Sequence, residues 1–356
     1  MAFRAEIKAD SISPDGCRLT SFEATYPRIV HSEVMTHRAS ARNSASTRAI
    51  PIVDQLYNLL HNPFVPEKLG INQKGMQASQ DLSGLKHEQA VEIWLTGRDR
   101  AVTTVLELLL GREIAEEVLQ YESNREFVPG EILLQDFDKI KALLPKSTDT
   151  IDLADTSMLN VHKQLAGRGL EAYMWHTIVW SMTETENFFA LRDHKDAQGE
   201  IATIARLMRQ AYEESEPRKL DYGEWHLPYV EEGEFEQVFD GIRASGARAA
   251  ATSYNRQNNK NPAREFERYG ELVLGWHMSP LEHQATPFSH EERGVRKAAQ
   301  RTIMELRHSR NLDDLSISQM IEGLEFNGPF RGFTQQRKRL RHESNFGAFL
   351  AEQAAA

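Results

Sequence analysis

The segment from Thr36 to Arg48, THRASARNSASTR, concentrates side chains that could bind an anion. It contains no acidic residue, although the whole chain has 52 Asp and Glu against 42 Lys and Arg, and a net charge of -10. Guanidinium and hydroxyl groups donate to phosphate oxygens, so the segment predicts a site for a phosphate or an anionic cofactor. A solvated surface loop is the alternative. The donors are His37, Arg38, Ser40, Arg42, Asn43, Ser44, Ser46, Thr47 and Arg48.

Three further segments combine polar, charged and apolar residues that could serve the same site. NFFALR spans 187–192 and is followed by Ala197-Gln198, RAAATSY spans 248–254, and HMSPLEH spans 277–283. The two histidines of HMSPLEH are separated by five residues and do not form the His-Glu-x-x-His pattern of zinc enzymes. We therefore expect no metal site there.

Together these segments resemble the motifs of flavin-dependent thymidylate synthases. In that family Arg-His-Arg is followed after seven residues by Ser, a pattern that His37-Arg38 and Ser46 match. Thr36 replaces the first arginine, as in long, viral-type members. NFFALR resembles Asn-Phe-x-x-Leu-Arg, HMSPLEH resembles His-x-(Ser/Thr)-Pro-Phe-Glu-His, and RAAATSY resembles Arg-Ala-Ala-Arg-x-Ser-Phe. The last two precede Arg-His-Arg in the short enzymes and follow it here, so the chain resembles a rearranged version of the same site.

The resemblance implies an enzyme that transfers a one-carbon unit from methylenetetrahydrofolate to C5 of dUMP, with FAD as cofactor and NADPH as reductant. It implies an α+β fold like that of the thymidylate synthase complementing protein, helix-rich with a small, mainly antiparallel sheet. It also implies a homotetramer whose sites lie between subunits. A related methylase or hydroxymethylase acting on dCMP or dUMP is the alternative activity.

The motifs assign roles by position. Arg192 and Ser46 are the candidate catalytic residues, Arg192 because a guanidinium facing the pyrimidine oxygens stabilises enolate-like charge. Ser46 is expected to bind phosphate rather than to act as a nucleophile, since no base is adjacent in sequence. The implied nucleotide-binding residues are Glu33, Ser44, Ser46, Thr47, Arg48, Lys163 and Arg192. The implied flavin-binding residues are His37, Arg38, Asn43, Asn187, Ser253, His277 and Ser279.

The single cysteine is consistent with a flavin route. A conventional thymidylate synthase needs a cysteine nucleophile, but Cys17 lies between Gly16 and Arg18 with no neighbouring base. Reduced flavin can supply electrons and carry the one-carbon unit without such a residue. Cys17 is therefore interpreted as a bystander thiol.

Two departures from the family leave the substrate open. Glu33 stands where the short enzymes have glutamine, and Ser44 stands where they have glutamate. A carboxylate only accepts hydrogen bonds, and the N4 amino group of cytosine donates them, so Glu33 is compatible with dCMP. The alternative is that Glu33 pairs with a neighbouring arginine.

A basic stretch suggests a competing class of function. FRGFTQQRKRLRH at 330–342 clusters five cations with two phenylalanines and could contact nucleic acid. A solvated face or a subunit contact is the simpler interpretation, and the acidic net charge argues against nucleic-acid binding. A non-catalytic helical scaffold would explain the helical periodicity but not the matched segments. The five cations are Arg331, Arg337, Lys338, Arg339 and Arg341.

The elements that must position these segments are mostly helical by their apolar spacing. A strand is expected at 18–25, a ligand-wrapping loop at 39–50, and a connection at 214–236. A capping box of Thr183 and Glu186 is expected to start a helix that breaks near 193–196. The other expected helices span 27–38, 52–61, 86–121, 131–144, 157–180, 240–252, 263–276 and 291–308.

The chain is expected to divide into residues 1–215, a connection at 216–238, and a second region at 239–356. The first would carry the Arg-x7-Ser loop and the pyrimidine-binding helix, and the second the flavin segment HMSPLEH and the basic stretch. The N-terminus lacks the apolar core of a signal peptide, and no segment reaches the roughly 20 apolar residues of a membrane helix. A cytoplasmic protein without a membrane partner is expected.

Overall fold

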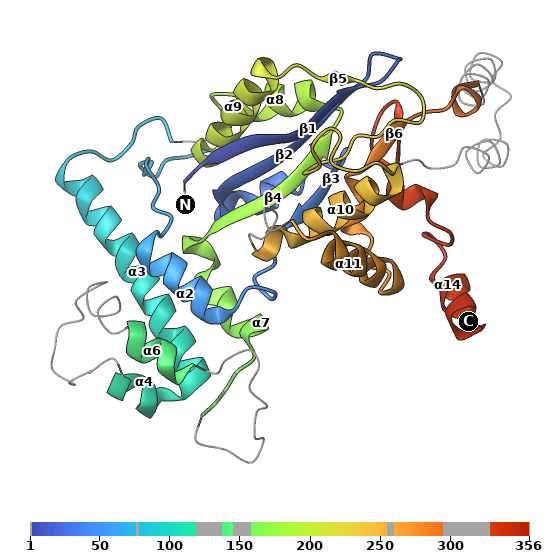
Figure 1. Cartoon of the computed structure of the whole chain (residues 1–356). Coiled ribbons are helices and arrows are strands. Elements are labelled where there is room, and N and C mark those ends of the chain that lie inside the picture. The colour runs from blue at the N-terminus through green and yellow to red at the C-terminus, as the bar shows by residue number, and fades with distance from the viewer. Residues whose placement is uncertain are drawn as a thin grey trace, which may run out of the picture.

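The computed structural model is organised around a five-stranded sheet with helices on both sides (Figure 1). The strand order is β3-β4-β2-β1-β5, and all neighbours are antiparallel except β1 and β5. The chain is therefore α+β, helix-rich with a small mixed sheet, as predicted at that level. The described residues are 2–75, 78–118, 137–144, 158–254, 260–294 and 328–355. The strands are β1 (Arg4–Ile12), β2 (Arg18–Pro27), β3 (Ser40–Ser44), β4 (Trp175–Met182) and β5 (Arg218–Lys219).

Strands β1 and β2 form a hairpin that the sequence only partly indicates. The turn is closed by backbone hydrogen bonds from Ser13 to Cys17 and from Gly16 to Ser13. Gly16 has a φ of +78°, a left-handed conformation that glycine adopts without a Cβ clash. The strand predicted at 18–25 is confirmed within β2, whereas β1 was not expected.

One face of the sheet packs against helices α8 (Thr185–Arg192) and α9 (Gly199–Glu214). Side chains alternate across a strand, so Phe22 of β2 and Trp180 of β4 share this face. Ile201, Ile204 and other apolar residues of α9 complete the core there. The opposite face carries Ser21, Glu23, Thr25 and Ser181, all buried, which requires polar partners from a covering segment.

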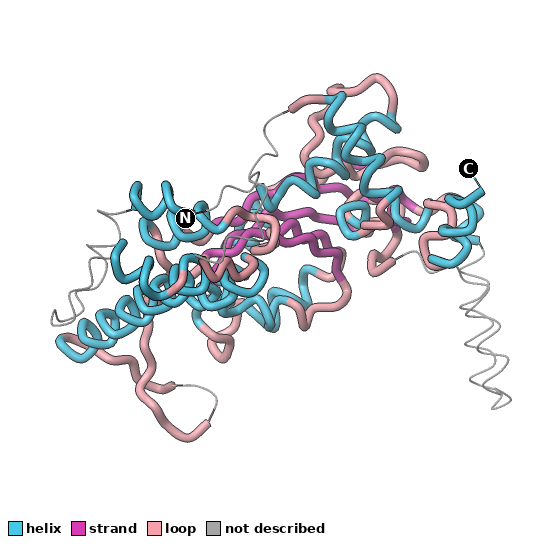
Figure 2. The backbone as a smooth tube through the Cα atoms, turned by 90° about the horizontal axis from the view of Figure 1, so that it is seen from below, coloured by secondary structure: helices cyan, strands magenta, loops and turns pink. Residues whose placement is uncertain are grey.

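The connection at 216–238 and the second region together cover this face: His226 bonds to Ser21, Tyr229 to Glu23, and His283 to Ser181. Gly246 lies where a Cβ would come within 2.7 Å of the Leu281 side chain, so a residue without a side chain allows close packing. Figure 2 shows the strands in the middle of the molecule, with helices on both sides. The elements of this region are α10 (Val238–Ala250), η3 (Ala251–Tyr254), α11 (Pro262–Leu274), η4 (Ser279–Glu282), β6 (Ala285–Pro287), β7 (Phe333–Gln335), η5 (Gln336–Arg339) and α14 (Phe346–Ala355).

A separate helical lobe follows β3 and has its own apolar core. Leu56 and Leu59 of one helix pack with Val102, Val105 and Leu106 of another. No helix in the described part of the chain is long and apolar enough to cross a membrane. The lobe consists of α2 (Ile52–His61), α3 (Leu85–Leu110), α4 (Arg112–Val118), α6 (Phe137–Leu143), α7 (Lys163–Ala166) and the 3-10 helix η2 (Gly167–Tyr173).

Two predicted elements near the site are wrong. The helix expected at 157–180 is largely replaced by η2 and β4, because a strand buried on both faces has a continuous apolar pattern that periodicity does not separate from a helix. The loop expected at 39–50 contains β3, whose small polar residues are held by pairing with β4. Tertiary pairing overrides local composition in both cases.

Several predicted helices end earlier than expected. The helix at 27–38 is only η1 (Arg28–Val30) followed by α1 (His31–Val34), and the helix at 86–121 is interrupted at Gly111, which has a φ of +87°. The capping box at Thr183 does not form, because Thr183 accepts a hydrogen bond from the backbone of Arg331 instead. Residues 131–136 and 295–308 lie outside the described residues.

Candidate functional site

Two of the matched segments meet where α1 approaches the end of α8. Arg192 Nε donates to Nε2 of His37 at 2.8 Å, and Arg192 Nη2 donates to Oγ1 of Thr36 at 3.0 Å. Arg192 Nη1 also lies 3.6 Å from Oε2 of Glu33. All three nitrogens of the guanidinium are thereby oriented by residues 155 to 159 positions away, and its 22% exposed side chain remains accessible.

His37 is held in a neutral form that suits this contact. Its ring packs at right angles to Phe188 and at a tilt to Trp180, with centroids 5.0 and 6.2 Å away. Burial, reinforced by the positive charges of Arg192 and Arg42, lowers the pKa of His37 to about 4. The neutral ring can accept at Nε2 from Arg192 only if its proton is on Nδ1.

Thr36 explains one departure from the family pattern. Its hydroxyl donates to the carbonyl oxygen of Glu33 at 2.6 Å and accepts from Arg192. An arginine at this position has no acceptor and would place a second positive charge beside Arg192. The threonine hydroxyl can therefore accept from Arg192, which an arginine at this position could not do.

Three arginines of the 36–48 segment have no carboxylate partner among the described residues. Arg38 and Arg48 are exposed. Arg42 donates to the backbone carbonyls of Val34 and His37, at 3.1 and 2.8 Å. The segment thus keeps its positive charge in an acidic protein, as a site for an anionic ligand requires.

Strand β3 brings a third matched segment to the same edge of the sheet. Asn43 Nδ2 donates to the carbonyl oxygen of Ala249 at the end of α10, at 2.7 Å. Ser279 Oγ of η4 lies 3.5 Å from Asn43 Oδ1, which is a weak contact. Because neighbouring residues of a strand point to opposite faces, Asn43 and Arg42 lie on opposite sides of β3. Because β3 is an edge strand of the sheet, only the thickness of this strand separates the side chains of Arg42 and Asn43.

The turn after β3 holds the predicted phosphate ligands. Ser46 Oγ accepts from the backbone N–H of Arg48 at 3.3 Å, and Gln55 Nε2 holds the carbonyl oxygen of Thr47 at 2.7 Å. Thr47 Oγ1 donates to Oε1 of Glu171 at 3.4 Å. The hydrogen bond from Gln55 fixes the backbone of this turn, and the side chain of Arg48 remains exposed.

Glu171 brings two arginines near this turn that sequence reasoning missed. Its carboxylate lies 2.7 Å from Arg168 Nη1 and 3.3 Å from Arg28 Nη2. Arg168 and Thr47 thus contact the same carboxylate, whereas Lys163 begins α7. The three-residue spacing of Arg168 and Glu171 is the only sequence signal for the pair.

The remaining predicted residues are less constrained. Asn187 on α8 and His277 before η4 are exposed, and Ser44 at the end of β3 is partly exposed. All three are accessible to a ligand. The side chain of Ser253 lies outside the described part of the structure.

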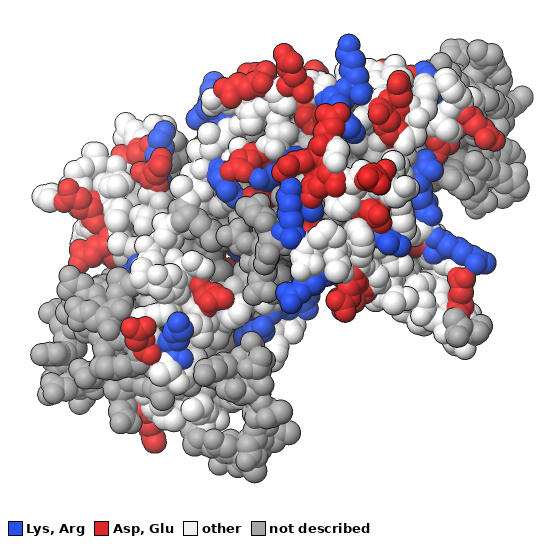
Figure 3. All heavy atoms as spheres, viewed as in Figure 1, with Lys and Arg blue, Asp and Glu red and all other residues white. Residues whose placement is uncertain are grey.

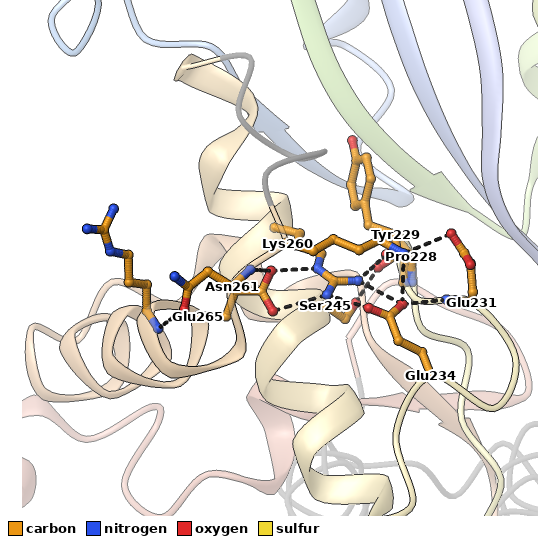
Figure 4. Close-up of polar contacts among 10 residues, drawn as sticks. Pro228, Tyr229, Glu231, Glu234, Ser245, Lys260, Asn261 and Glu265 are labelled. Carbon is orange, nitrogen blue, oxygen red and sulfur yellow. Dashed lines mark hydrogen bonds and ion pairs between the residues drawn. The ribbon is translucent and has the colours of Figure 1, made fainter.

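Arg248, the first residue of RAAATSY, has a structural role. It is 2% exposed and forms hydrogen-bonded ion pairs with Glu265 of α11 and Glu234 of the preceding loop (Figure 4). Its Nη1 also donates to the carbonyl oxygen of Tyr229 at 2.7 Å. A buried guanidinium satisfied on each side joins α10, α11 and the 228–236 loop into one unit. Arg248 is therefore not accessible to a ligand.

The basic stretch at 330–342 is paired rather than free. Each of its five named cations forms an ion pair with a carboxylate of the chain. Arg337 bonds to Glu282 of η4, which ties the stretch to the 277–283 segment. Burial raises the pKa of Glu282 despite this partner. Figure 3 shows acidic and basic side chains interspersed over the face in view rather than one continuous basic patch.

Among the residues that the structure describes, no group of three or more His, Cys, Asp and Glu side chains could hold a metal ion. Compared with known proteins, the sequence matches no family model and no curated sequence.

Proposed function

We propose that the chain is a flavin-dependent thymidylate synthase that transfers a one-carbon unit from methylenetetrahydrofolate to C5 of dUMP, with FAD and NADPH. One observation carries the proposal. Arg192 of the Asn-Phe-x-x-Leu-Arg segment donates directly to Thr36 and His37 of the Thr-His-Arg segment. Two motifs that resemble one family's active site thus meet in space although they are far apart in sequence.

The donor set around β3 fits an anionic flavin dinucleotide. Arg42 supplies positive charge on one side of the strand, Asn43 with Ser279 supplies neutral polar groups on the other, and Arg38 is exposed just before the strand. His277 and Asn187 are exposed and available to the same ligand. When bound, the flavin would supply reducing electrons and a nitrogen that carries the one-carbon unit.

The nucleotide would lie between Arg192 and the turn after β3. Arg48 and Ser46 would bind its phosphate, and Glu171 holds Arg168 beside the same turn. Arg192 retains N–H groups beyond those used by Thr36 and His37, and these can donate to pyrimidine oxygens. Such donors act mainly on the charge that develops in the transition state.

The second candidate is a methylase or hydroxymethylase that uses dCMP. Glu33 lies 3.6 Å from Arg192, so a base that contacts this arginine lies within reach of a carboxylate. The carboxylate can accept from the N4 amino group of cytosine, and equally from N3–H of uracil. The ion pair also supports the simpler alternative, in which Glu33 only orients Arg192.

A non-catalytic nucleic-acid-binding protein is less well supported, since the cations of the 330–342 stretch already have carboxylate partners. We further propose the thymidylate synthase complementing protein-like fold, a homotetramer and a cytoplasmic location. These rest on the resemblance of the motifs.

The decisive experiment is product identification. The purified protein is incubated with methylenetetrahydrofolate, NADPH, FAD and either dUMP or dCMP, and the nucleotides are analysed by mass spectrometry. Formation of dTMP from dUMP supports the first proposal, and a methylated or hydroxymethylated dCMP supports the second. A colourless protein that binds no added flavin and forms neither product contradicts both.

A further inference from the structure

A chain of five buried side chains lies on the polar face of the sheet. Ser11 is 3% exposed, and Ser21, Ser181, His226 and His283 are 0% exposed. Ser11 Oγ lies 2.9 Å from His226 Nδ1, and His226 Nε2 lies 2.8 Å from Ser21 Oγ. Ser21 bonds to Ser181, whose Oγ lies 2.8 Å from His283 Nδ1. The chain therefore links three strands to the connection at 216–238, through His226, and to the second region, through His283.

All four bonds of this chain can run in one direction, so that each member between two partners donates one hydrogen bond and accepts one. Burial lowers the pKa of both imidazoles to about 3, so each ring carries one N–H and one lone pair. Each serine between two partners likewise has one proton to donate and a lone pair with which to accept from the other side. Removing one hydroxyl therefore leaves a buried donor or acceptor unpaired on each side of the gap.

The residues around η4 divide into anchored and accessible ones. Leu281 is buried against Gly246, Glu282 bonds to Arg337, and His283 bonds to Ser181. By contrast, Ser279 is partly exposed beside Asn43, and His277 is exposed. The anchors follow one another along the chain immediately after the residues that the resemblance assigns to the flavin.

Ser181 lies where it can fix the position of η4 relative to β3. In the sheet it pairs with Ala41 of β3, two residues before Asn43. The bond from His283 to Ser181 therefore attaches η4 to the same stretch of sheet that presents Asn43 to Ser279. Arg337 also bonds to Glu282, but it belongs to the second region itself and therefore does not fix the position of η4 along β3.

We infer that the hydrogen bond between Ser181 and His283 positions the 277–283 segment against β3, and so places Ser279 and His277 at the flavin site. His283 and Ser181 are positioning residues, because both are fully buried and act through the segment that they hold. The consequence for flavin rests on the proposed function. The positioning itself rests only on the contacts described.

Two measurements on Ser181→Ala test the inference. In the protein without flavin, amide hydrogen exchange of 277–283 is expected to accelerate at least tenfold while β1 and β2 stay protected. With flavin, the dissociation constant from fluorescence titration is expected to rise at least tenfold. Thr25→Val is the matched control, since Thr25 forms a similar hydroxyl pair with Thr177 on the same two strands, 2.9 Å apart and away from η4. It should change either quantity less than twofold.

A pair of substitutions at His283 provides the rescue test and does not depend on Ser181→Ala folding. In His283→Asn the side-chain amide takes the position of the imidazole Nδ1 and can keep the bond to Ser181. In His283→Gln the amide takes the position of Nε2, so the bond to Ser181 is lost. The inference predicts slow exchange in 277–283 for Asn and fast exchange for Gln. Equal exchange in the two variants, or unchanged exchange in folded Ser181→Ala, overturns it. A wild-type protein that binds no flavin would instead contradict the proposed function, and the exchange data would still decide the positioning.

Discussion

Acid should destabilise this protein steeply, because His226 and His283 are buried as neutral rings. Burial lowers the pKa of both from 6.5 to about 3, with a smaller contribution to His226 from the charge of His283 and of Arg218. The folded state therefore binds fewer protons than the unfolded state between these pH values. The stabilisation is complete above pH 6.5 and is lost as the pH falls toward 3.

The size of the effect follows from linkage. At pH 4.5 each ring is two pH units below its unfolded pKa and still neutral in the folded state, which costs about 2.7 kcal/mol per histidine. The two together cost about 5 kcal/mol, comparable to the roughly 5 to 15 kcal/mol that a folded domain has in total. The depressed pKa values of His31, His37 and His176 act in the same direction.

Urea unfolding followed by circular dichroism at pH 7.5, 6.0, 5.0 and 4.5 measures this dependence. His283→Asn keeps an amide for Ser181 and removes one titrating ring, so the loss of unfolding free energy from pH 6 to 4.5 should shrink by about 2 kcal/mol. His162→Asn is the control, because His162 is exposed and asparagine can replace it as the cap of α7. If His283→Asn and wild type lose stability in parallel, the ring of His283 is not neutral in the folded protein.

The other predictions concern the proposed site. Arg192→Ala should retain flavin but lose roughly 10² to 10³ in kcat, because the lost donor acts in the transition state; normal turnover would make Arg192 a surface residue. His277→Ala should weaken flavin binding in a protein that circular dichroism shows to be folded, and an unchanged affinity would remove 277–283 from the site. Thr36→Val should lower kcat less than Arg192→Ala does, since only one of three contacts to the guanidinium is lost; equal losses would show that Thr36 has a further role. Light scattering should give the mass of a tetramer, and a flavin-bound monomer would contradict the proposed assembly.

The sequence singled out the residues of the proposed site but not the elements that carry them. Composition singled out the 36–48 segment, because uncompensated arginines are visible without a structure. It did not reveal β3 inside that segment, since the strand is held by pairing with β4 rather than by local preference. Strand β4 was also missed, because its continuous apolar run was assigned to a helix.

Contacts between distant segments were the least predictable part. Motif resemblance suggested that Arg192 and His37 serve one site, but nothing in the sequence specifies that one donates to the other. The role of Arg337 as a partner of Glu282 is equally invisible in a run of basic residues. Ser21 and Ser181 belong to strands whose pattern shows only that they face away from the apolar side, not that two histidines satisfy them.

The edge position of β3 has a thermodynamic consequence. The strand has a single neighbouring strand, β4; it carries Arg42 and Asn43, which are assigned to flavin, and leads into the turn with Ser46 and Arg48, which are assigned to the nucleotide. A ligand bound to either the strand or the turn restricts the motion of both, so the entropic cost of ordering them is met once and not repeated for the second ligand. Nucleotide and flavin should therefore bind with positive cooperativity, and each should tighten the other by the same factor.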